Sequence, residues 1–222
     1  MDMGYGWIKF VWGSYLKLLG IQAVVSGLEH VPSGPKIIVA NHPNATDGWN
    51  LPFLFKEKLN FLVEYDALQT RIVGRWMQLA DSIPVIAGRG MEALHAAHER
   101  LLRGNSVVIF PEGKLTTTHQ VTRSGTGVAR LALAAQLPIL PIGFYVPRQN
   151  LRILHGHAWD GRPTVGSWQT KGKCYIRIGQ PISVSVERAH RESYRFFRRF
   201  TEEIMQSVAA LANQAQQKAE MQ

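Results

Sequence analysis

Short apolar runs alternate along most of the chain with polar segments that contain glycine or proline. Several runs are rich in β-branched residues and end at turn-forming residues, a pattern that predicts buried strands. The strand-like segments lie at residues 22–29, 37–40, 60–64, 82–87, 106–110, 138–146 and 173–182. Helical spacing is found at residues 66–79, at 91–103 and from about 187 onwards, and a short helix is expected after Asp47. This alternation predicts an α/β fold with a mixed, mostly parallel central sheet flanked by helices.

The length of 222 residues suits one domain with a full core and is too short for two. Glycine, proline and aromatic residues gather at 147–173 without a regular period, so we expect a long irregular loop there. The expected organisation is an N-terminal helix at residues 1–20, the main domain at 21–213 and a frayed tail at 214–222.

The N-terminal segment at residues 4–19 is rich in apolar and aromatic residues, with Lys9 and Lys17 among them. Lys9 interrupts the run too early for the roughly 20 apolar residues that a spanning helix needs. Aromatic rings and lysines together suit an amphipathic helix that lies in the membrane interface. The alternative is a helix packed on the core of the domain.

The charge balance points to an anionic partner. Lysine and arginine total 25 against 16 acidic residues, a net charge of +9, which suits a phospholipid surface, a nucleic acid or a phosphate-bearing substrate. The basic residues are not interleaved with aromatic residues as in nucleic-acid-binding proteins, so we expect no nucleic acid partner. The single Cys174 cannot form an internal disulfide, and no spacing typical of a zinc site is present in the sequence.

Two strand-like runs end in clusters of polar residues that could take part in catalysis. The first reads KIIVANHPNATD and delivers His42 at its end and Asp47 five positions later. The second reads SVVIFPEGK and presents Glu112 and Gly113 after a proline. Ligands in open α/β sheets bind at the carboxyl ends of strands. Asp47 would begin the next helix and could hold one imidazole nitrogen of His42, leaving the other nitrogen to take a proton.

The combination of NHPNATD with FPEG resembles the glycerolipid acyltransferases of the lysophosphatidate acyltransferase type, whose signature is H-x-x-x-x-D followed by F-P-E-G. IPVIAGR at 83–89 and LPILPIGF at 137–144 are similar to further blocks of that family. The resemblance implies a glycerol-3-phosphate acyltransferase-like fold and no cofactor. It also implies transfer of a fatty acyl group from acyl-CoA or acyl carrier protein to the hydroxyl of a lysophospholipid-type acceptor, with 1-acylglycerol-3-phosphate first among the candidates.

In such a transfer His42 would act as the general base, because an alcohol is a poor nucleophile at neutral pH. Asp47 would fix the tautomer of His42 and stabilise the imidazolium. We predict a substrate-binding set of Asn41, Arg89, Glu112, Gly113, Lys114 and Arg123. Within it, Arg89, Lys114 and Arg123 could hold an acceptor phosphate. Glu112 could contact the acceptor hydroxyl, pair with Arg89 or brace its own loop, and the 147–173 loop could cover the acceptor site.

Two other function classes are compatible with the sequence. His42, Asp47 and Glu112 could serve metal-assisted hydrolysis of a phosphoester. The basic surface could instead belong to a non-catalytic protein that binds anionic lipid. The leading expectation is an O-acyltransferase of phospholipid biosynthesis, held peripherally at the cytoplasmic face of a membrane.

Overall fold

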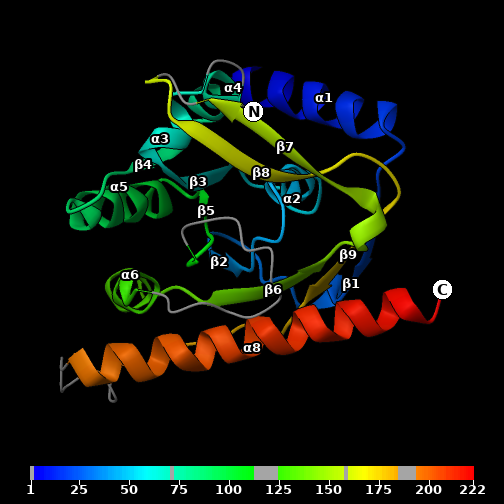
Figure 1. The fold of residues 1–222 in the computed structure, drawn as a ribbon. Coiled ribbons are helices and arrows are strands. Elements are labelled where there is room, and N and C mark those ends of the chain that lie inside the picture. Colours follow the sequence, from blue (N-terminus) through cyan, green and yellow to red (C-terminus); the bar gives the residue numbers. More distant parts are fainter. Residues whose placement is uncertain (1–2, 71–72, 113–124, 158–159, 185–193) are drawn as a thin grey trace.

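The computed structural model describes the chain except for residues 1–2, 71–72, 113–124, 158–159 and 185–193. A seven-stranded sheet forms its centre, with the strand order β1-β9-β6-β2-β5-β3-β4 (Figure 1). Its strands are β1 (Gln22–Ser26), β2 (Ile37–Ala40), β3 (Leu59–Glu64), β4 (Ile83–Val85), β5 (Ser106–Ile109), β6 (Ile139–Tyr145) and β9 (Lys173–Ile178). Neighbouring strands run parallel except β6 and β9, which are antiparallel. The predicted mixed, mostly parallel sheet is therefore confirmed.

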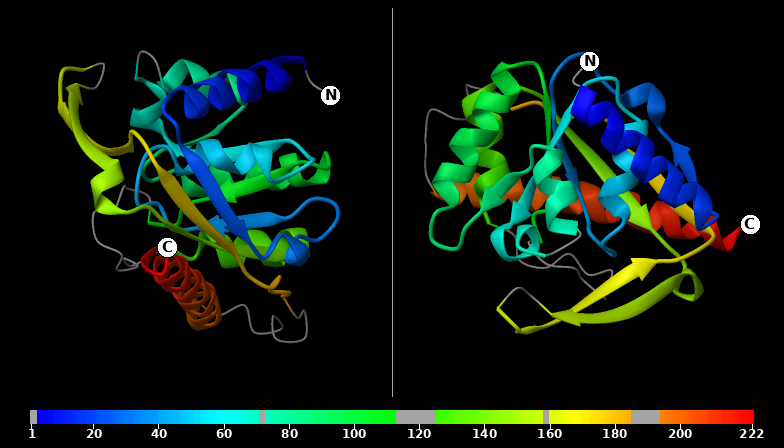
Figure 2. Two further views of the ribbon diagram at one scale, coloured as in Figure 1. Left: turned by 90° about the vertical axis from the view of Figure 1, so that its right-hand side faces the viewer. Right: turned by 90° about the horizontal axis from the view of Figure 1, so that it is seen from above.

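Helices cover both faces of the sheet, as Figures 1 and 2 show. One face carries α1 (Met3–Leu18) and α2 (Asp47–Asn50), and the other carries α5 (Gly90–Leu102), α6 (Gly127–Ala135) and α8 (Tyr194–Glu220). The other helices in the described part of the chain are α3 (Tyr65–Leu68), α4 (Val73–Leu79) and three short 3-10 turns, η1 (Leu28–His30), η2 (Leu51–Phe53) and η3 (Arg148–Asn150). Successive residues of β2 point to opposite faces, so this strand contributes to both cores.

The helix α1 packs on the domain through one face and exposes the other. Tyr5, Ile8, Trp12 and Leu16 are buried at intervals of three or four residues, as expected for one side of a helix. The backbone N–H of Leu59 donates to the Tyr5 hydroxyl at 3.1 Å. The opposite side leaves Trp7 59% and Phe10 64% exposed. Core packing and an outward aromatic face thus coexist in this helix. Among the helices that the structure describes, none is long and apolar enough to cross a bilayer.

Three sequence expectations differ from the structure. Residues 147–173 are not irregular: they form an antiparallel hairpin of β7 (Leu151–His157) and β8 (Pro163–Gln169), which projects from the body of the molecule (Figure 2). The helix expected at 66–79 is two short helices, α3 and α4. The tail expected to fray from 214 is helical to Glu220, because Ala215 of α8 is buried.

The contact of α8 with β6 provides a test of the fold. The backbone of α8 passes so close to Gly143 that an added Cβ would lie 2.2 Å from the Ala212 nitrogen. Gly143→Ala should therefore lower the free energy of unfolding by about 1–3 kcal/mol through overpacking, measured by denaturant unfolding. Gly6→Ala in α1 is the matched control, since a Cβ there meets nothing within 4 Å. This control should gain up to about 1 kcal/mol from helix propensity. Equal stabilities of the two variants would contradict the packing described.

Candidate active site

The end of β2 is fastened to its neighbour β6 before the chain reaches His42. The Asn41 side chain donates from Nδ2 to the Phe144 carbonyl at 2.9 Å, and the Phe144 N–H donates to Asn41 Oδ1 at 2.7 Å. The Asn41 amide is therefore bonded to backbone at both of its polar ends. His42 leaves the sheet at the carboxyl end of a strand that is hydrogen-bonded on both sides, by β5 and by β6.

His42 is held between a carboxylate and an aromatic ring. Its Nδ1 lies 3.3 Å from Asp47 Oδ2, and its ring stacks on Phe110 with 4.1 Å between ring centroids and 17° between planes. The His42 side chain is 22% exposed and that of Asp47 is 0% exposed. Since Nδ1 faces the carboxylate, the opposite ring nitrogen Nε2 is the one directed away from Asp47. The imidazole is thus oriented from within the protein and remains partly exposed.

The Asp47 carboxylate lies at the start of α2, wholly inside the protein. Oδ2 accepts the Asn44 backbone N–H at 2.8 Å, and Oδ1 accepts Asn44 Nδ2 at 2.5 Å. Burial raises the pKa of Asp47, while the bonds from His42 and Asn44 oppose that rise. Cys174 of β9 lies near enough for the charge of Asp47 to add to the effect of burial, which raises the pKa of the thiol well above its usual value.

The second strand-end motif contributes to the same edge of the sheet. β2 and β5 pair in parallel, with Val39 opposite Ile109, so the turns that follow both strands emerge side by side. Phe110 provides the ring under His42, and the partly buried Glu112 follows two residues later. The structure thus brings His42, Asp47 and the 110–112 turn to one place. Gly113, Lys114 and Arg123, predicted to bind substrate, lie outside the described residues.

Arg89 occupies a different part of the same edge. It follows β4, which is separated from β2 by β5 and β3. Its guanidinium donates two hydrogen bonds to Glu92, at 2.7 and 2.6 Å, and its side chain is 59% exposed. Arg89 and Glu92 line a recess of about 200 Å³ beside Ile83 and Ala93. In this structure the guanidinium is paired with Glu92 of the helix that follows it.

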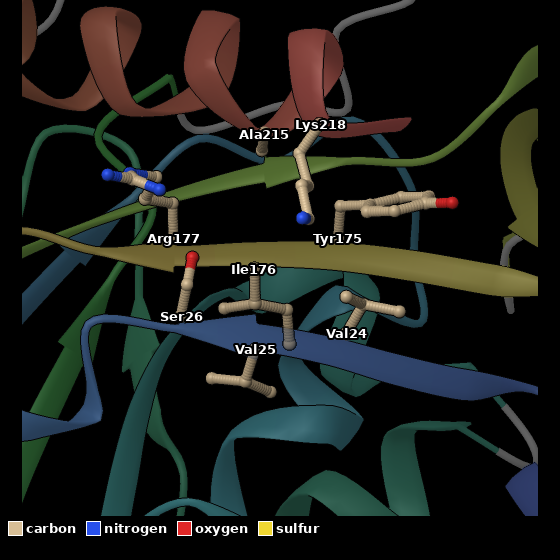
Figure 3. Close-up of a pocket in the computed structure, with 8 residues that line it drawn as sticks. All are labelled: Val24, Val25, Ser26, Tyr175, Ile176, Arg177, Ala215 and Lys218. Atoms are coloured by element: carbon tan, nitrogen blue, oxygen red, sulfur yellow. The ribbon is translucent and has the colours of Figure 1, made fainter. Parts of the chain in front are cut away.

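A second recess, of about 50 Å³, lies at the far edge of the sheet, between β1, β9 and α8 (Figure 3). Ser26, Arg177 and Lys218 are among its lining residues. The strand order places β1 three strands away from β2. This recess therefore has no part in the site around His42. Within the described residues, no group of three or more His, Cys, Asp or Glu side chains is placed to hold a metal ion.

Sequence reasoning missed the contacts that hold the turn between His42 and Asp47. Asn44 Oδ1 accepts from the Thr46 backbone N–H at 2.9 Å and from the Thr46 hydroxyl at 2.5 Å. The Ala45 N–H donates to the carbonyl of Ser167 in β8 at 2.8 Å. An asparagine two residues before a threonine is a local signal for such a turn, whereas the contact with β8 has none.

The sequence is similar to those of known acyltransferases. A family model described as Acyltransferase matches residues 22–145. The 1-acyl-sn-glycerol-3-phosphate acyltransferase of Pseudomonas aeruginosa is 30% identical over 152 residues, which cover 64% of this chain and 58% of that protein. The 1-acyl-sn-glycerol-3-phosphate acyltransferase alpha of Mus musculus is 24% identical over 177 residues, covering 75% of this chain and 56% of that protein. The chain therefore spans somewhat more than half the length of these curated relatives.

A solved structure shares the fold. The crystal structure of the 1-acyl-sn-glycerophosphate acyltransferase PlsC from Thermotoga maritima matches with a TM-score of 0.66 and 21% identity, covering 93% of this chain and 78% of that chain. The family model spans more than half of the 222 residues and includes both the NHPNATD turn and the FPEG turn. The chain therefore belongs to the acyltransferase family.

Proposed function

We propose that this protein transfers a fatty acyl group from a thioester donor to the hydroxyl of a lysophospholipid, with His42 as general base. The observation that carries the proposal is the buried Asp47 carboxylate 3.3 Å from Nδ1 of a partly exposed His42 at the carboxyl end of a parallel strand. Membership of the acyltransferase family supports this reaction. The relatives are named 1-acyl-sn-glycerol-3-phosphate acyltransferases, which supports a lysophospholipid acceptor.

The proposed chemistry follows from the orientation of the ring. Nε2 of His42 removes the proton of the acceptor hydroxyl as its oxygen attacks the thioester carbonyl. The new C–O bond forms, the C–S bond breaks, and the proton on His42 is available to the departing thiolate. Asp47 keeps Nδ1 protonated and stabilises the transient imidazolium. Because the acceptor supplies the attacking oxygen, the reaction needs no acyl-enzyme intermediate.

The acceptor would be a lysophospholipid that carries a phosphate, 1-acylglycerol-3-phosphate in the first instance. Arginine suits a phosphate because its planar guanidinium donates two hydrogen bonds at once. To bind a phosphate, the Arg89 guanidinium would release the Glu92 carboxylate and donate its hydrogen bonds to the phosphate instead. Lys114, Arg123 and the Gly113 backbone remain candidates for the same site, with Glu112 near the acceptor hydroxyl. Acyl-CoA and acyl carrier protein both remain possible donors.

We further propose that α1 attaches the protein to the cytoplasmic face of a membrane. The outward side of α1 carries Trp7 stacked on Phe10 at 5.8 Å, with Lys9 and Lys17 on the same helix. Such amphipathic rings and basic side chains are typical of membrane-interface helices. The net charge of +9 favours anionic lipid headgroups.

The catalytic pair is tested by replacing each partner. His42→Ala should lower the rate of acyl transfer by roughly 10²–10⁴-fold, because the general base is lost. Asp47→Asn should give a smaller loss. The products of acyl-CoA and lysophosphatidate would be quantified by mass spectrometry, with circular dichroism to verify folding. His95→Ala is the control, since His95 is an exposed histidine of α5 that pairs with Glu99.

Product formation by His42→Ala at the wild-type rate would refute the proposal. A chelator provides a second discrimination, because acyl transfer by His42 and Asp47 should be insensitive to it. Loss of all activity on chelation would favour metal-assisted hydrolysis instead.

The membrane role of α1 is tested by surface changes rather than truncation, because Ile8 and Trp12 belong to the core. The double variant Trp7→Ser, Phe10→Ser should weaken binding to phosphatidylglycerol-containing vesicles by at least about tenfold, since each apolar side chain contributes on the order of 1.5–3 kcal/mol when buried. Vesicle co-sedimentation measures the effect. Met91→Ser with Leu102→Ser, two exposed changes on α5, should leave binding unaltered. Equal loss in both double variants would contradict a specific role for α1.

A further inference from the structure

The turn between His42 and Asp47 contains a second polar pair that the proposed mechanism does not use. We infer that Asn44, itself held by Thr46, is a positioning residue that keeps the Asp47 carboxylate aimed at His42. This inference rests on the proposed function and extends it from two residues to a chain of four. The chain runs from Thr46 to Asn44, from Asn44 to Asp47 and from Asp47 to His42.

Each carboxylate oxygen of Asp47 has its own partners. Oδ2 receives the Asn44 backbone N–H at 2.8 Å and faces His42 Nδ1 at 3.3 Å. Oδ1 receives the Asn44 side-chain Nδ2 at 2.5 Å. A carboxylate that is held through both oxygens cannot rotate about its Cβ–Cγ bond without breaking a bond. The side chain of Asn44 thereby fixes the plane of the carboxylate that orients the imidazole.

Thr46 determines which end of the Asn44 amide faces Asp47. Asn44 Oδ1 accepts two hydrogen bonds, from the Thr46 backbone N–H at 2.9 Å and from the Thr46 hydroxyl at 2.5 Å. An amide rotated by 180° would place its oxygen against the carboxylate and its NH₂ group against the Thr46 backbone N–H, which can only donate. Both of those contacts are unfavourable, so the NH₂ group is directed to Asp47.

Burial separates this role from substrate binding. Asn44, Thr46 and Asp47 are each 0% exposed, whereas His42 remains partly exposed. The acceptor and the thioester can therefore reach His42 without contacting Asn44. A change at Asn44 should act on the rate of the chemical step more than on the affinity for substrate.

The hydrogen bonds to Asp47 also influence the protonation of the pair that Asp47 forms with His42. Burial raises the pKa of Asp47, and the hydrogen bonds from His42 and Asn44 oppose this. The titratable groups that face the carboxylate are His42 and, from β9, the thiol of Cys174, which burial keeps protonated. Glu112 follows the Phe110 ring on the other side of His42. Removing the Asn44 donor increases the proton affinity of the Asp47 and His42 pair, whichever member takes the proton.

The test compares Asn44→Ala with the wild-type protein in the acyl-transfer assay. We expect kcat to fall roughly 10–100-fold, as for other residues that orient a catalytic group, with KM changed by less than about twofold. The acidic limb of the kcat/KM profile should move to higher pH, because the pair then binds its inhibitory proton more tightly. Thr46→Val removes the hydroxyl donor and keeps the backbone N–H. This variant should shift kcat and the pH profile in the same direction by less.

A buried asparagine elsewhere provides the matched control. Asn60 in β3 is also 0% exposed, donates to the Asp81 carbonyl at 2.8 Å and accepts from Asn105 at 3.0 Å. Asn60→Ala should lower stability, measured by denaturant unfolding, and leave the pH profile of the folded enzyme unchanged. A role of Asn44 in folding alone would make Asn44→Ala behave in the same way as Asn60→Ala.

The outcomes separate this inference from the proposed function. A wild-type kcat and pH profile in Asn44→Ala, measured beside an inactive His42→Ala, overturns the positioning role and leaves the catalytic pair intact. Activity in His42→Ala overturns both. If Asn44→Ala does not fold, Thr46→Val decides the question, because an unchanged pH profile in that variant also overturns the inference.

Discussion

Asp47 has no exposed surface, and a carboxylate removed from water must receive hydrogen bonds from the protein if it is to remain charged. The turn from residue 42 to residue 47 meets this requirement with donors from His42 and from the backbone and side chain of Asn44. The separation of five positions between His42 and Asp47 is sufficient to bring the imidazole against the carboxylate. The spacing of the motif is thus a geometric consequence of satisfying one buried acid.

The short helix that begins at Asp47 is itself supported from two directions. Trp49, two residues after Asp47, stacks parallel to Trp12 of α1 at 5.9 Å and meets Trp168 of β8 edge-on at 5.8 Å. A helix of four residues has little stability of its own, so these rings supply what its hydrogen bonds cannot. The N-terminal helix and the projecting hairpin therefore both brace the element that carries Asp47.

Part of this arrangement could be read from the sequence, because its causes are local. The β-branched runs that end at Asn41 and Phe110 predict two buried strands, and adjacent parallel strands necessarily place their following turns together. The hairpin β7–β8 could not be predicted. Six of the seven residues of β7 are exposed, so the strand has no alternation of buried and exposed positions to reveal it. The bond between Ala45 and Ser167 joins residues more than a hundred positions apart, which no local pattern can specify.

The partner of Arg89 also could not be predicted from the sequence motif alone. A sequence motif places an arginine after β4, but the partner of its guanidinium depends on how α5 begins. Glu92 lies three residues on, in the first turn of that helix, where a carboxylate is favoured by the helix dipole and within reach of Arg89. Arg89 is therefore paired locally in this structure, and a bound phosphate would have to replace Glu92.

Near the two ends of β2, the hydrogen-bond partners of two acids oppose the effect of burial to different extents. At the amino end, Lys36 and Ser106 bond to Glu57, and the pKa of Glu57 is lowered although burial alone would raise it. At the carboxyl end, the partners of Asp47 do not fully offset burial, and its pKa is raised. The hydrogen bonds from Lys36 and Ser106, with a smaller effect of the Lys36 charge, account for the first case. Asp47 instead faces a histidine that must be neutral to accept a proton. A base that takes up a proton during the reaction benefits from a neighbouring carboxylate whose attraction is not already neutralised by a permanent cation. The absence of a lysine or arginine from the described hydrogen-bond partners of Asp47 is thus consistent with the chemistry proposed for His42.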